Sequence, residues 1–95
     1  CTLNIDNKRH CVMIGEKEVY LSAKEFEVFY MLYLSPQITF TKEQIYERIW
    51  NEPANNHLHV VENTIFQIRK RLKPHCKGHE YIKTVIGYGY KFNSD

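Results

Sequence analysis

Long apolar runs and paired cysteines are both missing from this chain of 95 residues, and each absence narrows what it can be. No stretch approaches the roughly 18 apolar residues that a membrane-spanning helix requires, and the opening segment CTLNIDNKRH lacks the apolar core of a signal peptide. The three cysteines, Cys1, Cys11 and Cys76, are odd in number and lack the spacing of a disulfide framework, so we interpret them as packing or incidental residues. We therefore expect a soluble cytoplasmic protein with reduced thiols and no membrane partner.

A strong excess of charge of either sign is also missing. The chain has 13 Lys and Arg against 11 Asp and Glu, a formal net charge of +2, so the total charge does not by itself indicate a nucleic-acid partner. The sequence also lacks a Ser-His-Asp arrangement, a phosphate-cradling glycine loop and a pair of carboxylates suited to catalysis. We therefore expect neither an enzyme nor a cofactor. With 43% hydrophobic residues and no linker or repeat, residues 1–95 fit one domain with one core.

The first part of the chain has the pattern of short strands followed by a helix. Residues 3–21 alternate between apolar and polar positions around polar turns, which predicts short antiparallel strands. Ser22 and Glu25 then form a capping-box pattern, because the serine hydroxyl can accept the Glu25 amide while the carboxylate accepts the Ser22 amide. A first helix is predicted to begin there and to end at Ser35-Pro36.

A second helix is predicted by the same device. Thr41 and Gln44 repeat the capping-box spacing, and an apolar stripe follows as far as Trp50. We expect Trp50, at the end of that stripe, to be buried against the third helix. Pro53 and the asparagines after it indicate a loop.

The third helix is the most informative segment. Its core side is predicted by apolar residues at intervals of four, three and four, which fall within a narrow stripe: Val61, Ile65, Ile68 and Leu72. The opposite side presents Asn63, Phe66, Gln67 and Lys70, flanked by Arg69, Arg71 and Lys73. A basic helix face is often only a solvated surface. An aromatic residue in the middle of that face costs solubility, however, and needs a partner such as a thymine methyl, a sugar or another protein.

After the third helix the residue pattern changes from helical to strand-like. Residues 81–86 and 88–92 are rich in β-branched and aromatic side chains, and Gly87 and Gly89 allow positive φ at a tight reversal, which predicts a C-terminal hairpin. Strands, three helices and a hairpin, in this order, are typical of an α+β fold, the winged helix-turn-helix. In that fold the last helix enters the major groove of DNA and the hairpin, or wing, reaches the adjacent backbone or minor groove.

Four segments stand out along the chain in this order: LSAKEFEVFYML, TKEQIYERIW, VENTIFQIRKRL and YIKTVIGYGYKF. Together they resemble one known family, the C-terminal DNA-binding (effector) domains of OmpR/PhoB-type response regulators. LSAKEFEVFYML is similar to the family's opening helix, and TKEQIYERIW resembles its second helix with the usual terminal Trp. VENTIFQIRKRL matches the length and apolar positions of the recognition helix, and YIKTVIGYGYKF is similar to the Thr-Val-Arg-Gly-x-Gly-Tyr wing. The four motifs occur in the family's order and with gaps of the expected size.

The resemblance runs from about Leu3 to Phe92 and implies a function. It implies sequence-specific binding of double-stranded DNA as the output half of a two-component system, with a phosphorylatable receiver domain before Cys1 and a sensor kinase that acts on it. It implies direct-repeat sites bound by a tandem dimer of the protein. It also implies that the loop between the second and third helices faces RNA polymerase, and the exposed candidates there are Glu52, Asn55, Asn56 and His57.

The proposed DNA contacts separate by side-chain chemistry. Asn63 and Gln67 carry donors and acceptors for base edges, and Phe66 suits a thymine methyl. Side chains better suited to phosphate are Thr64, Lys70, Arg71 and, on the wing, Thr84. A hydroxyl bond within its own helix is the alternative for Thr64, and a surface ion pair is the alternative for Arg71. Tyr88 is expected either to touch a sugar or phosphate or to pack against the third helix.

Two departures from the family pattern bear on specificity. The family usually carries Arg in the wing where this chain has Ile86, which favours a weaker or apolar wing contact. Arg is also common where this chain has Gln67, and because Gln can pair with adenine N6 and N7, a site richer in A·T is expected.

Two other functions stay open at this point. One is a metal-sensing cluster of His57, His59, His75, Cys76 and His79, although this spacing matches no standard zinc finger. The other is a protein-interaction module in which Phe66 and the aromatic wing bind a partner chain.

Overall fold

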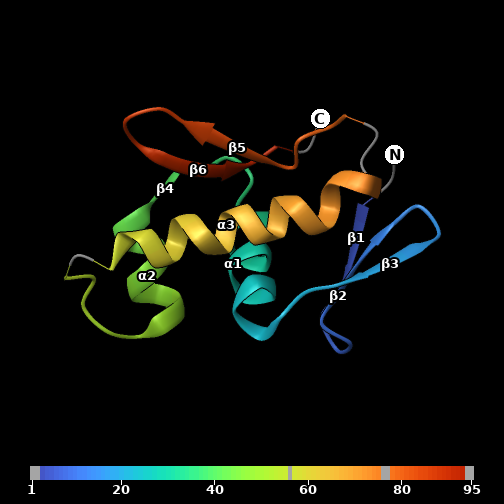
Figure 1. The fold of residues 1–95 in the computed structure, drawn as a ribbon, viewed down its shortest axis with the longest axis horizontal. Coiled ribbons are helices and arrows are strands. Elements are labelled where there is room, and N and C mark those ends of the chain that lie inside the picture. The colour runs from blue at the N-terminus through green and yellow to red at the C-terminus, as the bar shows by residue number, and fades with distance from the viewer. Residues whose placement is uncertain (1–2, 56, 76–77, 94–95) are drawn as a thin grey trace.

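Two three-stranded antiparallel sheets flank three helices in the computed structural model, which describes residues 3–55, 57–75 and 78–93 (Figure 1). The elements follow one another as β1 (Leu3–Asp6), β2 (Cys11–Ile14), β3 (Lys17–Tyr20), α1 (Ala23–Leu34), β4 (Phe40–Thr41), α2 (Lys42–Trp50), α3 (Leu58–Leu72), the 3-10 turn η1 (Lys73–His75), β5 (Ile82–Val85) and β6 (Gly89–Phe92). The predicted order of strands, three helices and hairpin is confirmed. No described helix is long and apolar enough to cross a membrane.

The N-terminal sheet has the order β1-β2-β3 and packs its central strand into the core. In β2, Val12 and Ile14 are buried, and Val12 faces Val19 across the β2–β3 ladder. Cys11 is also fully buried, and this burial raises the pKa of its thiol. Its interpretation as a packing residue is therefore confirmed, whereas Cys1 and Cys76 lie outside the described residues.

Both predicted capping boxes are present, and they fix where the first two helices begin. The Ser22 hydroxyl accepts the Glu25 amide at 3.4 Å, while the Glu25 carboxylate accepts the Ser22 amide at 3.1 Å. At the start of α2 the equivalent bonds between Thr41 and Gln44 measure 3.1 and 2.9 Å. Since each box satisfies two amides that a helix start otherwise leaves unpaired, it stabilises its helix by about 1 kcal/mol. The α2 helix ends at Asn51 in the left-handed conformation, and a loop leads to α3.

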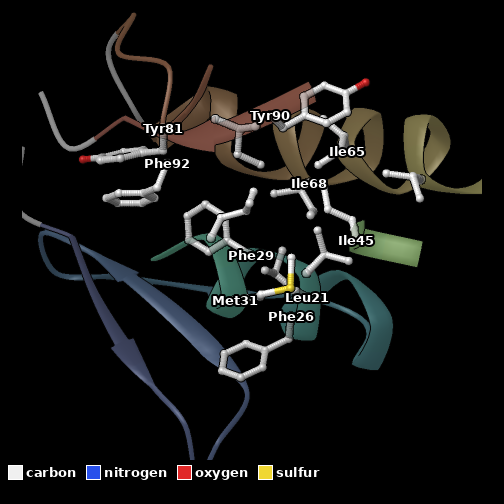
Figure 2. Close-up of a cluster of buried hydrophobic side chains, with 14 of the residues drawn as sticks. Leu21, Phe26, Phe29, Met31, Ile45, Ile65, Ile68, Tyr81, Tyr90 and Phe92 are labelled. Carbon is white, nitrogen blue, oxygen red and sulfur yellow. The ribbon is translucent and has the colours of Figure 1, made fainter. Parts of the chain in front are cut away.

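The apolar stripe of α3 forms the centre of the core, as predicted. Its four members, Val61, Ile65, Ile68 and Leu72, are all buried, and α3 packs against both α1 and α2. Figure 2 shows Ile65 and Ile68 above Phe29 of α1 and beside Ile45 of α2. Because this stripe is sequestered, the opposite side of α3 is the side left to face solvent.

Trp50 is only half-buried, so the prediction that it lies buried against the third helix is wrong. Its ring stacks on Tyr46 of its own helix, with centroids 5.1 Å apart, and Lys24 of α1 lies over it at 5.7 Å. Ile45 and Tyr46 take the buried positions of α2. As the last residue of a short helix, Trp50 therefore covers the edge of the core instead of filling its centre.

The C-terminal hairpin belongs to a second sheet of order β4-β6-β5, and β4 was not predicted. The hairpin turn closes with the Tyr88 amide donating to the Val85 carbonyl at 2.9 Å, and Gly87 adopts the predicted positive φ of 76°. Gly89 does not adopt a positive φ, so the prediction that this glycine serves to allow a positive φ is wrong. An added Cβ there would lie 1.9 Å from the Phe40 carbonyl oxygen, and Gly89 is therefore required by the close approach of β4.

Candidate nucleic-acid interface

The solvent side of α3 carries the residues predicted to read DNA. Asn63, Phe66, Gln67 and Lys70 are all exposed, and Phe66 is 61% exposed despite its aromatic ring. Asn63 and Gln67 are one helical turn apart, so their amide groups project from the same face. In Figure 1 the hairpin of β5 and β6 runs along one side of α3, while α1 and α2 lie on the other.

Two residues predicted to bind phosphate have partners inside the protein. The Thr64 hydroxyl donates to the Val60 carbonyl one turn earlier at 2.8 Å, which is the alternative expected for this side chain. Arg71 Nε donates to the Glu25 carboxylate at 2.7 Å, and Glu25 is buried. The Glu25 carboxylate thus accepts hydrogen bonds both from the Ser22 amide, in the capping box of α1, and from Arg71, near the C-terminal end of α3. To donate to a phosphate, the Thr64 hydroxyl would have to break its hydrogen bond to the Val60 carbonyl. Arg71 binds Glu25 through Nε, and its other two guanidinium nitrogens can donate to a phosphate.

Arg69 has a specific role that the sequence reasoning missed. Its Nη2 donates to the Ile82 carbonyl at 2.9 Å and to the Thr84 hydroxyl at 2.7 Å, and its guanidinium carbon lies 5.7 Å from the centroid of the Tyr90 ring. One side chain of α3 therefore contacts both strands of the wing. The sequence placed Arg69 on the flank of the helix, and only the position of the hairpin, set by distant residues, identifies its acceptors.

The wing presents a polar strand and an apolar tip. Thr84 is exposed on β5, Ile86 is 95% exposed in the turn, and Tyr88 is 60% exposed after it. This exposure makes Tyr88 available to a partner. At this tip the chain has Ile86, where the family that the sequence resembles usually has an arginine.

The charges on α3 favour an anionic partner. Basic residues occupy its last turn, where they also complement the helix dipole, and the single acidic residue of the helix, Glu62, is paired with Lys42 of α2. The Glu62 carboxylate raises the pKa of Lys42 by this bond. A groove of about 500 Å³ lies between the C-terminal half of α3 and residues 78–82, and it is lined on the helix side by Phe66 and Lys70 and, in η1, by Lys73.

The loop between α2 and α3 is tied to the core by Tyr46. The Tyr46 hydroxyl donates to the Glu52 carboxylate, and His57 Nδ1 lies 3.4 Å from the same hydroxyl. The bond to Glu52 raises the pKa of Tyr46. Three of the four predicted polymerase-facing residues, Glu52, Asn55 and His57, are exposed, and Glu52 and His57 lie together at the Tyr46 hydroxyl. The fourth, Asn56, lies outside the described residues.

The histidines of the described residues, and Cys11, can also be compared with the geometry of a metal centre. Among the residues that the structure describes, no three His, Cys, Asp or Glu side chains lie close enough to hold an ion. The predicted rival cluster includes Cys76, which lies outside them. His57 instead approaches Tyr46, and His79 contacts the ring of Tyr81 and the carbonyl of Asn93.

These elements define a winged-helix domain. It has an N-terminal sheet, three helices of which the third exposes one face, and a C-terminal hairpin that is bonded to that third helix. Residues 16–92 match the family described as transcriptional regulatory protein, C terminal, and the chain belongs to this family. It is similar to the transcriptional regulatory protein SrrA of Staphylococcus aureus (strain NCTC 8325 / PS 47), with 33% identity over 91 residues, which are 95% of this chain and 38% of SrrA. The chain thus spans well under half of that relative.

Two solved structures have the same architecture. The response regulator DrrB of Thermotoga maritima, an OmpR/PhoB homologue, has a TM-score of 0.80 and 33% identity, covering 96% of this chain and 41% of DrrB. The RstA DNA-binding domain of Klebsiella pneumoniae, solved in complex with the RstA box, has a TM-score of 0.83 and 25% identity, covering 97% of this chain and 91% of that one.

Proposed function

We propose that this chain binds double-stranded DNA sequence-specifically and regulates transcription as the output domain of a two-component response regulator. The observation that carries the proposal is the exposed face of α3, where two amide side chains one turn apart stand among cationic residues. An α-helix of this kind fits the major groove, whose floor offers donors and acceptors in a pattern unique to each base pair. The RstA domain, solved with its DNA box, shares this fold.

The exposed side chains of α3 have two different proposed roles, contact with the bases and contact with the phosphates. Asn63 and Gln67 read base edges, and Phe66 packs against a thymine methyl. Because amides and an aromatic ring carry no charge, these three contribute specificity without a strong dependence on salt. Lys70 contributes charge without sequence information, since phosphates are the same at every base pair.

The wing and two further α3 residues complete the proposed contact. Thr84 and Tyr88 are exposed on the wing, where they can bind the adjacent backbone. Arg71 can add a phosphate contact through the nitrogens that do not bind Glu25. Of the proposed DNA contacts, the one by Thr64 has the least support, because the Thr64 hydroxyl already donates its proton to the Val60 carbonyl.

The whole protein, of which the relatives suggest this chain is a part, is proposed to carry a receiver domain that a sensor kinase phosphorylates in the cytoplasm. Two copies would then bind a direct repeat in tandem. The exposed residues Glu52, Asn55 and His57, together with Asn56, are proposed to meet RNA polymerase. The contacts of Glu52 and His57 with the Tyr46 hydroxyl support this, because side chains that are already held in place lose less entropy on binding.

The direct test is selection from a pool of random duplexes, followed by affinity measurements on the selected duplex and on a shuffled one of equal length. We expect one enriched motif, with the selected duplex bound at least 1,000-fold more tightly than the shuffled one at moderate salt, as is usual for specific binding. No enrichment and no DNA affinity would instead favour a protein-interaction module that uses Phe66 and the wing.

A further inference from the structure

Arg69 fastens the wing to the recognition helix through neutral acceptors. Its Nη2 nitrogen carries two N–H groups, and these match its two acceptors, the Ile82 carbonyl and the Thr84 hydroxyl. The Nε atom is buried and has no hydrogen-bond partner among the described residues. Because both Nη2 bonds run to β5 and the guanidinium carbon lies 5.7 Å from the centroid of the Tyr90 ring, the guanidinium faces the hairpin, and Nη2 has no donor left for DNA.

This arrangement fixes what the Thr84 hydroxyl can do. A hydroxyl group has one proton to donate and two lone pairs to accept with. In Thr84 one lone pair receives the Arg69 donor, and within the described part of the chain the proton is donated to no acceptor. Thr64 is the opposite case, because its proton is donated to the Val60 carbonyl. Of the two threonines, Thr84 is thus the one set to donate outward.

The cationic donor also strengthens that outward bond. A hydroxyl that accepts from a guanidinium is polarised and becomes a better donor, since hydrogen bonds in a chain reinforce one another. An acceptor that suits such a donor is anionic, and on a DNA-facing surface it is a phosphate oxygen. Thr84 is exposed on β5 and is bonded to Arg69, whose neighbour in α3 is the exposed Lys70.

We propose that Arg69 is a positioning residue for DNA binding: it holds the wing at a fixed distance from α3 and directs the Thr84 proton toward a phosphate, without contacting DNA itself. The proposal rests on the DNA-binding function. It differs from a plain phosphate contact because the charge of Arg69 acts through a neutral hydroxyl.

The variants Arg69→Lys and Thr84→Val test this on the selected duplex. Lysine keeps the charge, but its side chain is shorter than that of arginine and lacks the planar group that lies against the Tyr90 ring, so its ammonium does not take the place of Nη2 between the two acceptors. Valine keeps the shape of threonine without its hydroxyl. We expect each single variant to bind about tenfold more weakly, the usual effect of losing a hydrogen bond to a charged group. Because the hydroxyl and its polarising donor act as one unit, the double variant should bind within about twofold of either single variant.

Two controls separate positioning from other roles. Thr84→Ser keeps the hydroxyl and should bind within about threefold of the unmodified chain. Lys70→Met, one residue away, should lower the slope of log K against log salt by about one unit, whereas Arg69→Lys should leave the slope unchanged.

Three results would overturn the proposal. They are near-normal affinity of Arg69→Lys, normal affinity of Thr84→Val, or losses that multiply to about a hundredfold in the double variant. Since Thr84→Val is a surface change close in shape, its result stands even if Arg69→Lys melts early. If the unmodified chain selects no duplex at all, the DNA-binding function itself fails; if it does select one, only the role of Arg69 is at stake.

Discussion

Replacing Gly89 by alanine should be the most damaging small change in the wing. Gly89 lies between two strands, pairing with Val85 of β5 and Thr41 of β4. An added Cβ would lie 1.9 Å from the Phe40 carbonyl oxygen, 2.8 Å from its carbonyl carbon and 2.9 Å from the Thr41 Cα. All three are backbone atoms, so no side-chain rotation relieves the overlap and β4 must move away from β6.

The cost follows from what that movement disrupts. Overpacking of this kind costs about 1–3 kcal/mol, and weakening the β4–β6 ladder adds about 1 kcal/mol. We expect a loss of about 3 kcal/mol in the free energy of unfolding, against a total of about 5–15 kcal/mol for a domain. For a chain of this size, this lowers Tm by roughly 12–24 °C.

Gly87→Ala, in the same hairpin, is the matched control. No atom lies within 4 Å of a Cβ at that position, and the penalty comes only from its φ of 76°. A left-handed alanine costs about 1–2 kcal/mol, which lowers Tm by roughly 5–15 °C. Thermal unfolding followed by circular dichroism measures both variants. A Gly89→Ala Tm equal to or above that of Gly87→Ala would refute the reasoning.

Three further predictions use different measurements. Trp50→Ala should cost about 1–3 kcal/mol in urea unfolding, below the 3–5 kcal/mol of a fully buried Trp, and a larger loss would contradict its partial exposure. Glu52→Gln should lower the pKa of Tyr46 in an ultraviolet titration at high pH, because it removes the carboxylate that raises it. Since the folded pKa of Tyr46 is raised, its stabilising contribution is complete below the unfolded value of about 10 and disappears as pH rises through the folded pKa; an unchanged titration in the variant would count against the bond. DNA binding should show a slope of log K against log salt of about −4 to −5, from about four to six phosphate contacts, whereas a flat response would favour a protein partner.

Local patterns were enough to predict most of the fold. Each capping box involves residues three apart, so Ser22 with Glu25 and Thr41 with Gln44 give the helix starts directly. The spacing along α3 identified its buried stripe, because one face of an amphipathic helix must pack. Both signals are complete within a few residues of sequence.

The features that the sequence did not predict depend on distant partners. The strand β4 has only two residues, and it exists because β6, about 50 positions later, pairs with it. Gly89 looked like a turn residue because its real constraint is the carbonyl of Phe40. Trp50 was expected inside because its apolar character was clear, while the stacking on Tyr46 that holds it at the edge was not.

The candidate site shows the same division. The exposure of Asn63, Phe66 and Gln67 follows from helical periodicity alone. The partner of Arg71 is Glu25, 46 positions earlier, and the acceptors of Arg69 lie 13 and 15 positions later. Which basic side chains face DNA and which are held by the protein therefore depends on how α1 and the wing pack against α3.

The central claim, that α3 reads DNA, is tested most directly by comparing Gln67→Ala with Lys70→Ala on the selected and shuffled duplexes. Both residues are exposed, so both variants should keep a native circular dichroism spectrum. Gln67→Ala should lose about 1–3 kcal/mol on the selected duplex only and relax the preference at one or two base pairs. Lys70→Ala should weaken both duplexes by similar factors and lower the salt slope by about one unit. If both folded variants instead bind both duplexes as the unmodified chain does, α3 is not the reading element and the account is contradicted.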